Sequence, residues 1–394
     1  MSNPKSHESE LSSNLEHVEQ LNQRIAICSS GEVFGGVERH ILGILSGLQM
    51  HGLSSLLLLF YDNELAGQAR KRGIETIIIK NFNLSLLSTS RYLAHIFEKY
   101  KIKIVHTHGY KAAFFCALAR CWFSFKMVKT EHGLPEPMSG RPIAELRNKA
   151  YYFLDTIATQ ITNATVCYVT EELSESCKFA HSGLQFKVIP NGIESPSRCK
   201  LSYPVEFNKN QFNLAIIGRL DTVKGHDLAI RAIANENLSS NIHLYIIGVG
   251  PCELNLKLLA DANGVAKRVH FLGFKSNIYD YVAHCDVLLM PSLHEGLPYT
   301  LLEAMALGIP IIASRVGGLA EILKNDINAL LIMPGNIEEI TQAIIRLHNS
   351  PTLCRYLGEN AQQLQKKHYS LEIMILRYLK IYMALLYKSE GFPS

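Results

Sequence analysis

The stretch PSLHEGLPYTLLEAMALGIPIIAS, from Pro291 to Ser314, follows one apolar run and ends in another. Its middle part has the composition of a helix, and its last residues are rich in isoleucine. A strand, a helix and a second strand in this order form the repeating unit of a parallel sheet covered by helices. The stretch therefore predicts an α/β fold, and its two carboxylates, Glu295 and Glu303, raise the question of what this junction binds.

Short runs rich in Ile, Leu and Val recur along the chain at helix-length intervals. Near-continuous apolar runs are typical of parallel strands buried on both faces. In the first half the runs are Arg24–Cys28, Ser55–Phe60, Ile74–Ile79, Ile102–His106, Lys126–Glu131 and Ala164–Val169. In the second half they are Phe212–Ile217, Ile242–Gly248, Arg268–Gly273, Asp286–Met290, Ile309–Ala313 and Ala329–Met333. We expect two consecutive doubly wound, Rossmann-like domains.

The alternation of strands and helices is interrupted once, between Val188 and Gln211, by a stretch rich in Pro, Gly, Ser and Asn. We expect residues 1–23 to be a polar N-terminal extension, and residues 24–200 to be the first domain. Residues 201–370 are expected to form the second domain, and residues 371–394 a C-terminal helix that crosses between the domains.

The composition excludes several classes of protein. A formal net charge of +4 over 394 residues is too small to indicate nucleic-acid binding. The nine cysteines contain no C-x-x-C pair, so neither a disulfide framework nor a zinc site is expected. No apolar run is long enough for a transmembrane helix, and the N-terminus lacks the apolar core of a secretory signal. We expect a cytoplasmic protein without a cofactor.

The junctions after the predicted strands are where α/β domains bind ligands. In GRLDTVKG, Arg219 and Lys224 follow Gly218 and precede a helix, which suits a diphosphate. A solvated loop with ordinary surface charges is the alternative. The glycines Gly248 and Gly250 in IIGVGP indicate close backbone approach or simply a tight turn. The same two interpretations apply to the glycine pair in VFGGVERH.

The spacing of Glu295 and Glu303 argues against a catalytic carboxylate pair. In a continuous helix they would be roughly 12 Å apart along the axis, at about 1.5 Å per residue. Glycoside hydrolysis needs carboxylates about 5–9.5 Å apart. A metal site lacks further ligands here. We therefore expect Glu295 in a loop and Glu303 in a helix that begins near Pro298, each accepting hydrogen bonds from a different part of one ligand.

The motifs GRLDTVKG, GVGP, VHFLG, PSLHEGLPYTLLEAMALGIPIIAS and GGLAEI occur in one order and spacing. With GGVERH, VHTHG, TEHG and VIPNG in the first half, the chain resembles the retaining GT-B glycosyltransferases of the family 4 type. The resemblance implies two Rossmann-like domains facing a central cleft. It also implies a nucleotide-sugar bound mainly by the second domain and an acceptor bound mainly by the first.

The resemblance also assigns roles to single residues. The catalytic set is Arg219 and Lys224 at the donor diphosphate, Glu295 at the transferred sugar and His132 over that sugar. The residues expected to bind the donor are Gly35, Gly36, Gly218, Gly248, Gly250, Phe274, Gly296, Leu297, Pro298, Tyr299, Thr300 and Glu303, the last at the ribose hydroxyls. His108 and Lys111 are candidates for the acceptor side, with a structural role as the alternative for His108. Pro298 stands where the family often has glycine, which leaves the donor sugar open.

The function expected from these features is transfer of a hexose from a nucleoside-diphosphate sugar, a UDP-sugar rather than GDP-mannose. The acceptor is expected to be a hydroxyl of a glycan or lipid-linked glycan in cell-surface polysaccharide synthesis. The resemblance implies that the transfer retains the anomeric configuration. Because Arg219 and Lys224 take the role that a metal ion has in other transferases, we expect the transfer to need no metal. A non-catalytic nucleotide-sugar-binding scaffold, a sugar-nucleotide epimerase and a sugar-phosphate synthase remain alternatives on the same fold.

The region from Lys99 to Lys149 has ten Lys and Arg residues against three Glu residues. It also contains the aromatic-rich segment KAAFFCALARCWFSFKMVK. One interpretation is a surface that meets anionic lipid on the cytoplasmic face of a membrane. The other is a buried helix with solvated ends.

Overall fold

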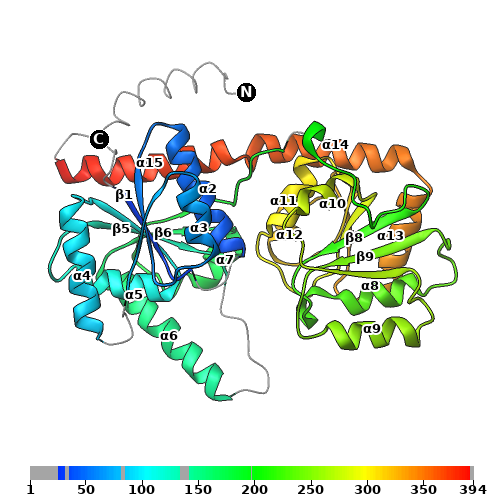
Figure 1. Cartoon of the computed structure of the whole chain (residues 1–394), viewed down its shortest axis with the longest axis horizontal. Helices are drawn as coiled ribbons and strands as arrows, with labels where there is room; N and C mark the ends of the chain where they lie inside the picture. Colours follow the sequence, from blue (N-terminus) through cyan, green and yellow to red (C-terminus); the bar gives the residue numbers. More distant parts are fainter. Residues whose placement is uncertain (1–24, 32–34, 81–84, 134–141, 197, 391–394) are drawn as a thin grey trace. The chain divides into compact units, whose positions relative to one another are not determined.

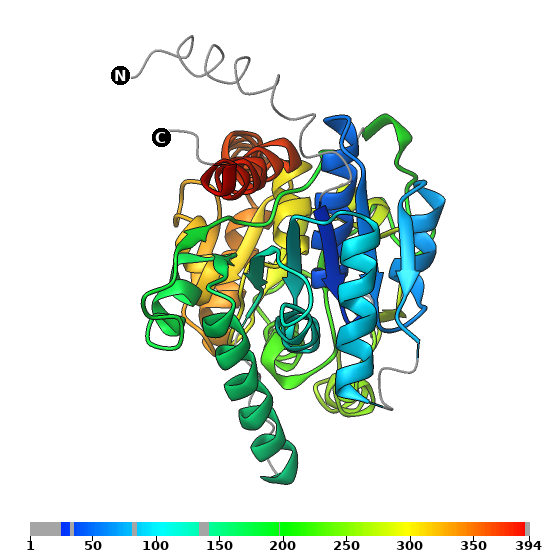
Figure 2. The ribbon, with the colours of Figure 1, turned by 90° about the vertical axis from the view of Figure 1, so that its left-hand side faces the viewer.

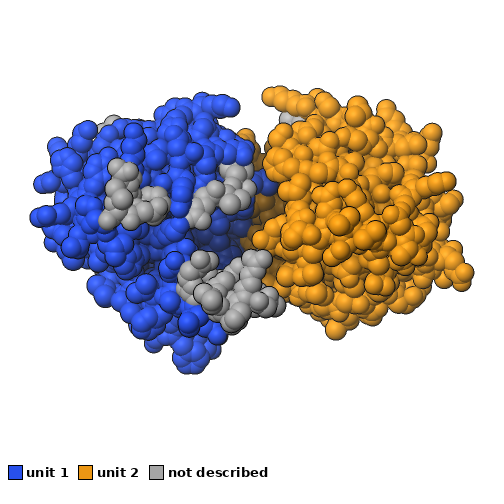
Figure 3. Space-filling model, turned by 60° about the horizontal axis from the view of Figure 1, so that its bottom comes forward, with its two compact units in different colours: residues 1–191, 371–394 blue, residues 192–370 orange. Residues whose placement is uncertain are grey.

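The computed structural model describes residues 25–31, 35–80, 85–133, 142–196 and 198–390. The chain divides into two compact units, shown in different colours in Figure 3. Unit 1 consists of Met1–Asn191 and Leu371–Ser394, and unit 2 consists of Gly192–Ser370. Each unit contains one sheet in which every strand pairing is parallel, which confirms the predicted pair of doubly wound domains.

Unit 1 is a seven-stranded sheet in the order β3-β2-β1-β4-β5-β6-β7. Its strands are β1 (Ile25–Ser29), β2 (Ser55–Leu59), β3 (Glu75–Ile78), β4 (Ile104–His108), β5 (Lys126–Glu131), β6 (Thr165–Tyr168) and β7 (Phe186–Val188). Its helices are α2 (Gly36–Met50), α3 (Glu64–Lys71), α4 (Leu86–Lys99), α5 (Tyr110–Ala119), α6 (Pro142–Ile161), α7 (Glu171–Cys177) and α15 (Leu371–Glu390).

Alternation along the strands of unit 1 divides its core into two layers. Ile25 and Ile27 of β1 pack with α2, α3 and α15, whereas Ala26 and Cys28 pack with α4 and α5. Because both faces are covered, β1 is buried along its whole length. Figures 1 and 2 show these layers, with α6 projecting away from the sheet.

The C-terminal helix α15 completes one face of unit 1. Its residue Ile375 packs directly on α2, where Gly47 lacks the side chain that would block it. A Cβ atom at Gly47 would lie 2.1 Å from Ile375 Cγ1. The first unit of the fold is therefore assembled from both ends of the chain.

Unit 2 is a six-stranded sheet in the order β10-β9-β8-β11-β12-β13. Its strands are β8 (Phe212–Ile217), β9 (Ile242–Ile247), β10 (Val269–Gly273), β11 (Val287–Met290), β12 (Ile311–Ser314) and β13 (Leu330–Ile332). Its helices are α8 (His226–Ile233), α9 (Glu253–Ala262), α10 (Ile278–His284), α11 (Tyr299–Ala306), α12 (Gly317–Ile322), α13 (Ile337–His348) and α14 (Pro351–His368), with 3-10 turns at Arg198–Lys200 and Thr222–Lys224.

The core of unit 2 has the same two-layer arrangement. Helices α8, α9 and α13 contribute to one apolar cluster, and α10, α11 and α12 contribute to the other. Parallel strands put all their carboxyl ends at one edge of the sheet, so the loops after β8, β9 and β11 meet there. None of the helices that the structure describes combines the length and apolar composition needed to span a bilayer.

Candidate active site

An ion pair between a partly exposed lysine and a buried glutamate joins two loops at the carboxyl edge of the unit 2 sheet. Lys224, after β8, places its Nζ atom 2.7 and 2.8 Å from the two carboxylate oxygens of Glu295, after β11. The Ser292 hydroxyl donates to Glu295 Oε1 at 2.8 Å. Between the same loops, the Leu293 N–H donates to the Val223 carbonyl at 2.8 Å. The Lys224 ammonium is therefore fixed by a carboxylate that is itself 7% exposed.

The second cation of this edge is more exposed. Arg219 follows β8 directly, and its Nε atom lies 2.6 Å from Asp221 Oδ2, with 57% of the arginine side chain exposed. Asp221 also caps the turn that contains Lys224, because its carboxylate accepts from the Val223 N–H at 3.0 Å. Asp221 thus stabilises the conformation of the Arg219–Lys224 loop through these two contacts.

Glycines let these loops approach one another backbone to backbone. A Cβ atom at Gly248 would lie 1.9 Å from the Gly218 carbonyl oxygen, and one at Gly250 would lie 2.3 Å from that of Leu220. Gly248 also adopts a φ of 146° that favours glycine. These glycines shape the loop that carries Arg219 whether or not they contact a ligand.

Helix α11 begins at Tyr299, with Pro298 as its N-cap residue, as the sequence predicted. Glu303 is the fifth residue of this helix and is completely buried, whereas Glu295 lies in the loop before it. Leu297 and Tyr299 are buried as well. The two carboxylates therefore stand in different surroundings, and Glu295 is already engaged by a lysine.

Phe274 and the N-terminus of α2 complete the predicted donor residues. Phe274, just beyond β10, is 67% exposed, so its ring is available to a ligand. In unit 1, Gly35 is the N-cap residue of α2, and its N–H donates to Glu38 Oε2 at 2.9 Å. Burial raises the pKa of Glu38. An anion that binds at the Gly35–Gly36 turn must therefore compete with this carboxylate.

Four histidines gather at the carboxyl edge of the unit 1 sheet. His40 comes from α2, His106 and His108 from β4, and His132 from the residue after β5. The Nδ1 atom of His108 lies 3.0 Å from Nε2 of His132. Burial lowers the pKa of His40 to about 4, and burial lowers the pKa of each of the other three well below its usual value. All four imidazoles are therefore neutral near pH 7.

A chain of hydrogen bonds connects two of these histidines to α15. With Asn191 Oδ1 as acceptor, His40 Nδ1 donates at 2.8 Å, so His40 Nε2 accepts from the Tyr378 hydroxyl at 3.1 Å. His106 lies 2.7 Å from both the Tyr382 hydroxyl and Thr130 Oγ1. His106 is thus a buried structural residue. His108 is 1% exposed, and the structure places it beside His132.

Two family descriptions match the chain over most of its length. Residues 34–195 match Glycosyltransferase Family 4, and residues 200–364 match Glycosyl transferases group 1. The chain belongs to the GT-B glycosyltransferases of the family 4 type. The predicted family is therefore confirmed, and each of its two matched regions carries one of the sheet edges described above.

Individual relatives of this glycosyltransferase agree with the family. It is 27% identical, over 69% of its chain and 73% of the relative, to the UDP-Gal:alpha-D-GlcNAc-diphosphoundecaprenol alpha-1,3-galactosyltransferase of Escherichia coli. An uncharacterized glycosyltransferase of Methanocaldococcus jannaschii is 26% identical over 88% of this chain and 94% of its own. The fold is that of HepE from Anabaena, solved in complex with UDP, with a TM-score of 0.78, 19% identity, and coverage of 92% and 100% of the two chains.

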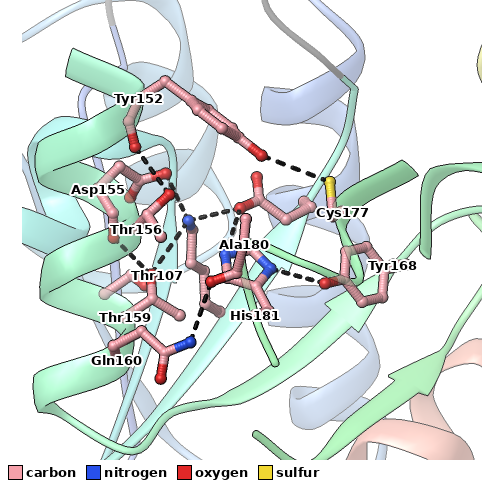
Figure 4. Close-up of polar contacts among 12 residues, drawn as sticks. Thr107, Tyr152, Asp155, Thr156, Thr159, Gln160, Tyr168, Cys177, Ala180 and His181 are labelled. Carbon is pink, nitrogen blue, oxygen red and sulfur yellow. Dashed lines mark hydrogen bonds and ion pairs between the residues drawn. The ribbon is translucent and has the colours of Figure 1, made fainter. Parts of the chain in front are cut away.

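One residue of the predicted basic surface of this glycosyltransferase is not on the surface. Lys129 is completely buried and forms ion pairs with Glu131 and with Asp155 of α6. Figure 4 shows Asp155 and Thr159 of α6 in this cluster, with Tyr168 beside His181. Burial favours the neutral amine, but the two carboxylates outweigh it and the pKa of Lys129 is raised. The charge count alone could not separate this lysine from solvated ones.

The remaining residues of that region divide between core and surface. Ala112, Phe115 and Cys116 of α5 are buried in the core, as expected for a helix that covers the sheet. Lys111 contacts Tyr61, with its Nζ atom 3.3 Å from the tyrosine hydroxyl. Arg141 lies outside the described residues, and Trp122 is 43% exposed.

Four residues of these sites were not predicted as site residues. Ser292 and Asp221 orient Glu295 and Arg219, while Asn191 and His40 form one buried pair. Ser292 and Asp221 lie in the quoted motifs within three residues of their partners, so proximity in sequence could have indicated them. His40 and Asn191 are 151 positions apart, and only the fold shows that they meet.

Proposed function

We propose that this glycosyltransferase transfers a sugar from a nucleoside-diphosphate sugar, a UDP-sugar rather than GDP-mannose, to a hydroxyl of a glycan or lipid-linked glycan. The transfer retains the anomeric configuration and needs no metal ion. The biological context is cell-surface polysaccharide synthesis. The observation that carries this proposal is the fixed pair Lys224–Glu295 beside Arg219, because it supplies cations at a sheet edge where a diphosphate can bind.

Electrostatics explains how this edge can promote transfer. Cleavage of the glycosyl–phosphate bond builds positive charge at the anomeric carbon and negative charge on the diphosphate. Arg219 and Lys224 stabilise the leaving diphosphate, and their positions are set before the reaction by Asp221 and Glu295. The acceptor hydroxyl attacks from the side of the leaving group and gives its proton to a phosphate oxygen. Retention then requires no carboxylate nucleophile.

The names of relatives support a nucleotide-sugar donor and a range of acceptors. HepE has been crystallised with UDP and with UDP-glucose. The relative from Escherichia coli is named for a UDP-sugar donor and a diphosphoundecaprenol-linked acceptor. Another relative, from Streptomyces kanamyceticus, is named 2-deoxystreptamine glucosyltransferase. These names favour UDP in the donor and leave the acceptor broad.

A panel of UDP- and GDP-sugars tests the proposal. We expect one UDP-sugar to bind and to be hydrolysed slowly without acceptor. The hydrolysis products are quantified by chromatography. The double variant Arg219→Ala and Lys224→Ala should abolish this turnover. Unchanged turnover in the double variant would reject the assigned site, and tight binding without any turnover would favour a non-catalytic scaffold.

Metal independence has its own test. Because Arg219 and Lys224 provide the positive charge, donor turnover should persist in excess chelator. Activity that disappears with chelator and returns with magnesium would contradict this part of the proposal.

A peripheral contact with the cytoplasmic face of a membrane is the proposed location of the reaction. Helix α6 exposes Leu146, Phe153 and Ile157 at helical spacing, with 71%, 64% and 37% of their surface accessible, and Lys149 is exposed beside them. We expect flotation with anionic vesicles to exceed flotation with neutral ones, and Phe153→Glu to reduce it. Equal recovery with both lipids would reject the electrostatic part.

A further inference from the structure

Three histidines of unit 1, two buried and one partly exposed, lie together in an arrangement that suits a metal ion. One ring nitrogen from each of His40, His108 and His132 lies within 4.8 Å of the others. We propose that His40, His108 and His132 form a binding site for zinc, and that zinc at this site inhibits the glycosyltransferase. The site lies at the carboxyl edge of the sheet. Zinc bound there competes with the donor sugar for His132 and is not a cofactor for transfer.

The distances between the rings favour three imidazoles around one ion. Zinc binds imidazole nitrogen at about 2.0–2.1 Å, so two nitrogens of a tetrahedral site are ~3.3 Å apart. The His108 and His132 nitrogens are already 3.0 Å apart. The ring centroid of His40 lies 5.6 Å from that of His108 and 4.8 Å from that of His132. The ligand nitrogens lie within 4.8 Å of one another, so a shortening of at most ~1.5 Å brings His40 to the tetrahedral spacing.

The histidines also have the chemical form that zinc requires. A metal binds the neutral imidazole, and burial keeps all three rings neutral by lowering their pKa values. His40 and His108 are buried, and His108 Nδ1 is the ring nitrogen that faces His132. His132 is partly exposed, which leaves a route for the ion and a position for a water as fourth ligand.

Asn191 supplies the outer contact that is typical of metal-binding histidines. Such histidines donate their second N–H to a carboxylate or carbonyl, which fixes the tautomer. His40 Nδ1 lies 2.8 Å from Asn191 Oδ1, so His40 Nε2 carries the lone pair that faces Tyr378. Zinc then replaces the Tyr378 hydrogen bond to Nε2 and leaves the Asn191 contact in place.

Inhibition follows from the role of His132 and rests on the proposed function. The family resemblance places His132 over the donor sugar, and a zinc ion bound to its ring prevents that contact. Mg²⁺ prefers oxygen ligands and should not bind here. Zinc should therefore lower donor turnover, and chelator should restore it to the metal-free rate.

The decisive measurement is zinc binding, because it does not depend on turnover. Full-length protein is first dialysed against chelator and then titrated with ZnCl₂ in competition with a chromophoric chelator. We expect one tight site per chain. Cobalt(II) at this site should give the intense visible absorption of a four-coordinate ion without thiolate charge-transfer bands, which separates the histidines from the nine cysteines.

Variants locate the site. His108→Gln and His132→Gln should each weaken zinc binding by about 100-fold or more, and Asn191→Leu by about 10-fold through the outer contact. The matched control is His270→Gln in unit 2. There, His243 Nδ1 and His270 Nε2 are 2.9 Å apart, but the described residues offer no third ligand for that pair.

The proposal fails if tight zinc binding survives both His108→Gln and His132→Gln, if His270→Gln removes it, or if cobalt shows thiolate bands. Absence of a tight site in the wild-type protein, which involves no folding defect, also overturns it. Zinc binding without inhibition would retain the site and reject only the assigned role of His132. Loss of all donor turnover in the metal-free protein would instead count against the proposed function.

Discussion

Unit 1 closes the carboxyl edge of its sheet with buried neutral histidines, whereas unit 2 places glycines, Arg219 and the Lys224–Glu295 pair at the corresponding edge. The two sheets share their parallel topology and their two-layer cores. The difference lies in where charge is kept. Unit 1 buries a complete ion-pair cluster around Lys129 inside the domain, while unit 2 keeps its cations partly exposed at the loops. The same architecture thus supports one edge with two partly exposed cations beside their paired carboxylates and one edge with neutral imidazoles.

The largest effect should come from breaking the buried charge cluster of unit 1. Lys129→Met leaves Glu131 and Asp155 without their shared cation, so the free energy of unfolding should fall by about 3–5 kcal/mol, measured by urea denaturation. Lys178→Met removes an exposed pair with Glu175 and should change it by less than about 0.5 kcal/mol. Equal small losses in the two variants would show that Lys129 is not held as described.

Charge at the edge of unit 2 should matter for activity instead. Lys224→Met should reduce the rate of donor turnover by about 10²–10³-fold, because one fixed donor to the developing charge is lost. Lys257→Met is the control, since Lys257 pairs at the surface with Glu253 within α9 and lies over the Phe271 ring, away from Arg219 and Lys224 in the sequence. Steady-state kinetics with saturating donor should separate the two variants, and similar rates in both would remove Lys224 from the site.

Glycine packing at the same edge gives the next effect. Gly250→Ala brings a Cβ atom to 2.3 Å from the Leu220 carbonyl oxygen, which is backbone and cannot rotate away. The free energy of unfolding should fall by about 3 kcal/mol, at the upper end of overpacking losses, and donor affinity should fall because Arg219 moves. Gly67→Ala in α3 meets no atom within 4 Å and should raise stability by about 0.5–1 kcal/mol. A stable, fully active Gly250→Ala protein would contradict the loop packing.

A pH-dependent loss of stability sharpens the comparison within unit 2. His226 is 1% exposed, and burial lowers its pKa from 6.5 to about 4, with Asp221, Asp227 and Lys224 as its charged neighbours. The unfolded chain therefore binds the proton first as the pH falls below 6.5, and stability is lost between pH 6.5 and 4. At pH 5 the loss in free energy of unfolding, relative to pH 7.5, should be about 2 kcal/mol smaller in His226→Leu than in the wild type. If the wild type and His226→Leu differed in free energy of unfolding by the same amount at pH 5 and pH 7.5, the prediction would be wrong.

Periodicity and motifs were sufficient for the fold and for much of the unit 2 edge. The run Phe212–Ile217 is a strand with the predicted bounds, and α11 starts after Pro298. The pairing of Lys224 with Glu295 was not foreseen, because the two were assigned to different parts of the donor. Strand β7 was also missed, since its first two residues are exposed and it is too short to show a pattern.

The unit 1 edge was less predictable for a physical reason. Lys129 was counted with surface cations, because a charge pattern does not show whether carboxylates from another helix neutralise a lysine. His40 and Asn191 meet because of the order of strands in the sheet and the position of Asn191 at the end of the first segment of unit 1. Neither property is local in the sequence. Histidines at strand ends could be noticed in the sequence, but their mutual distances could not.

Helix α15 has a consequence for the order in which the protein is made. Unit 2 is one continuous segment, Gly192–Ser370, so all of it is translated before α15. Unit 1 lacks Tyr378, Tyr382 and the apolar face of α15 until residues 371–390 are translated. Its histidine edge therefore lacks the hydrogen bonds from α15 in any chain that stops at residue 370, although such a chain contains the whole of unit 2.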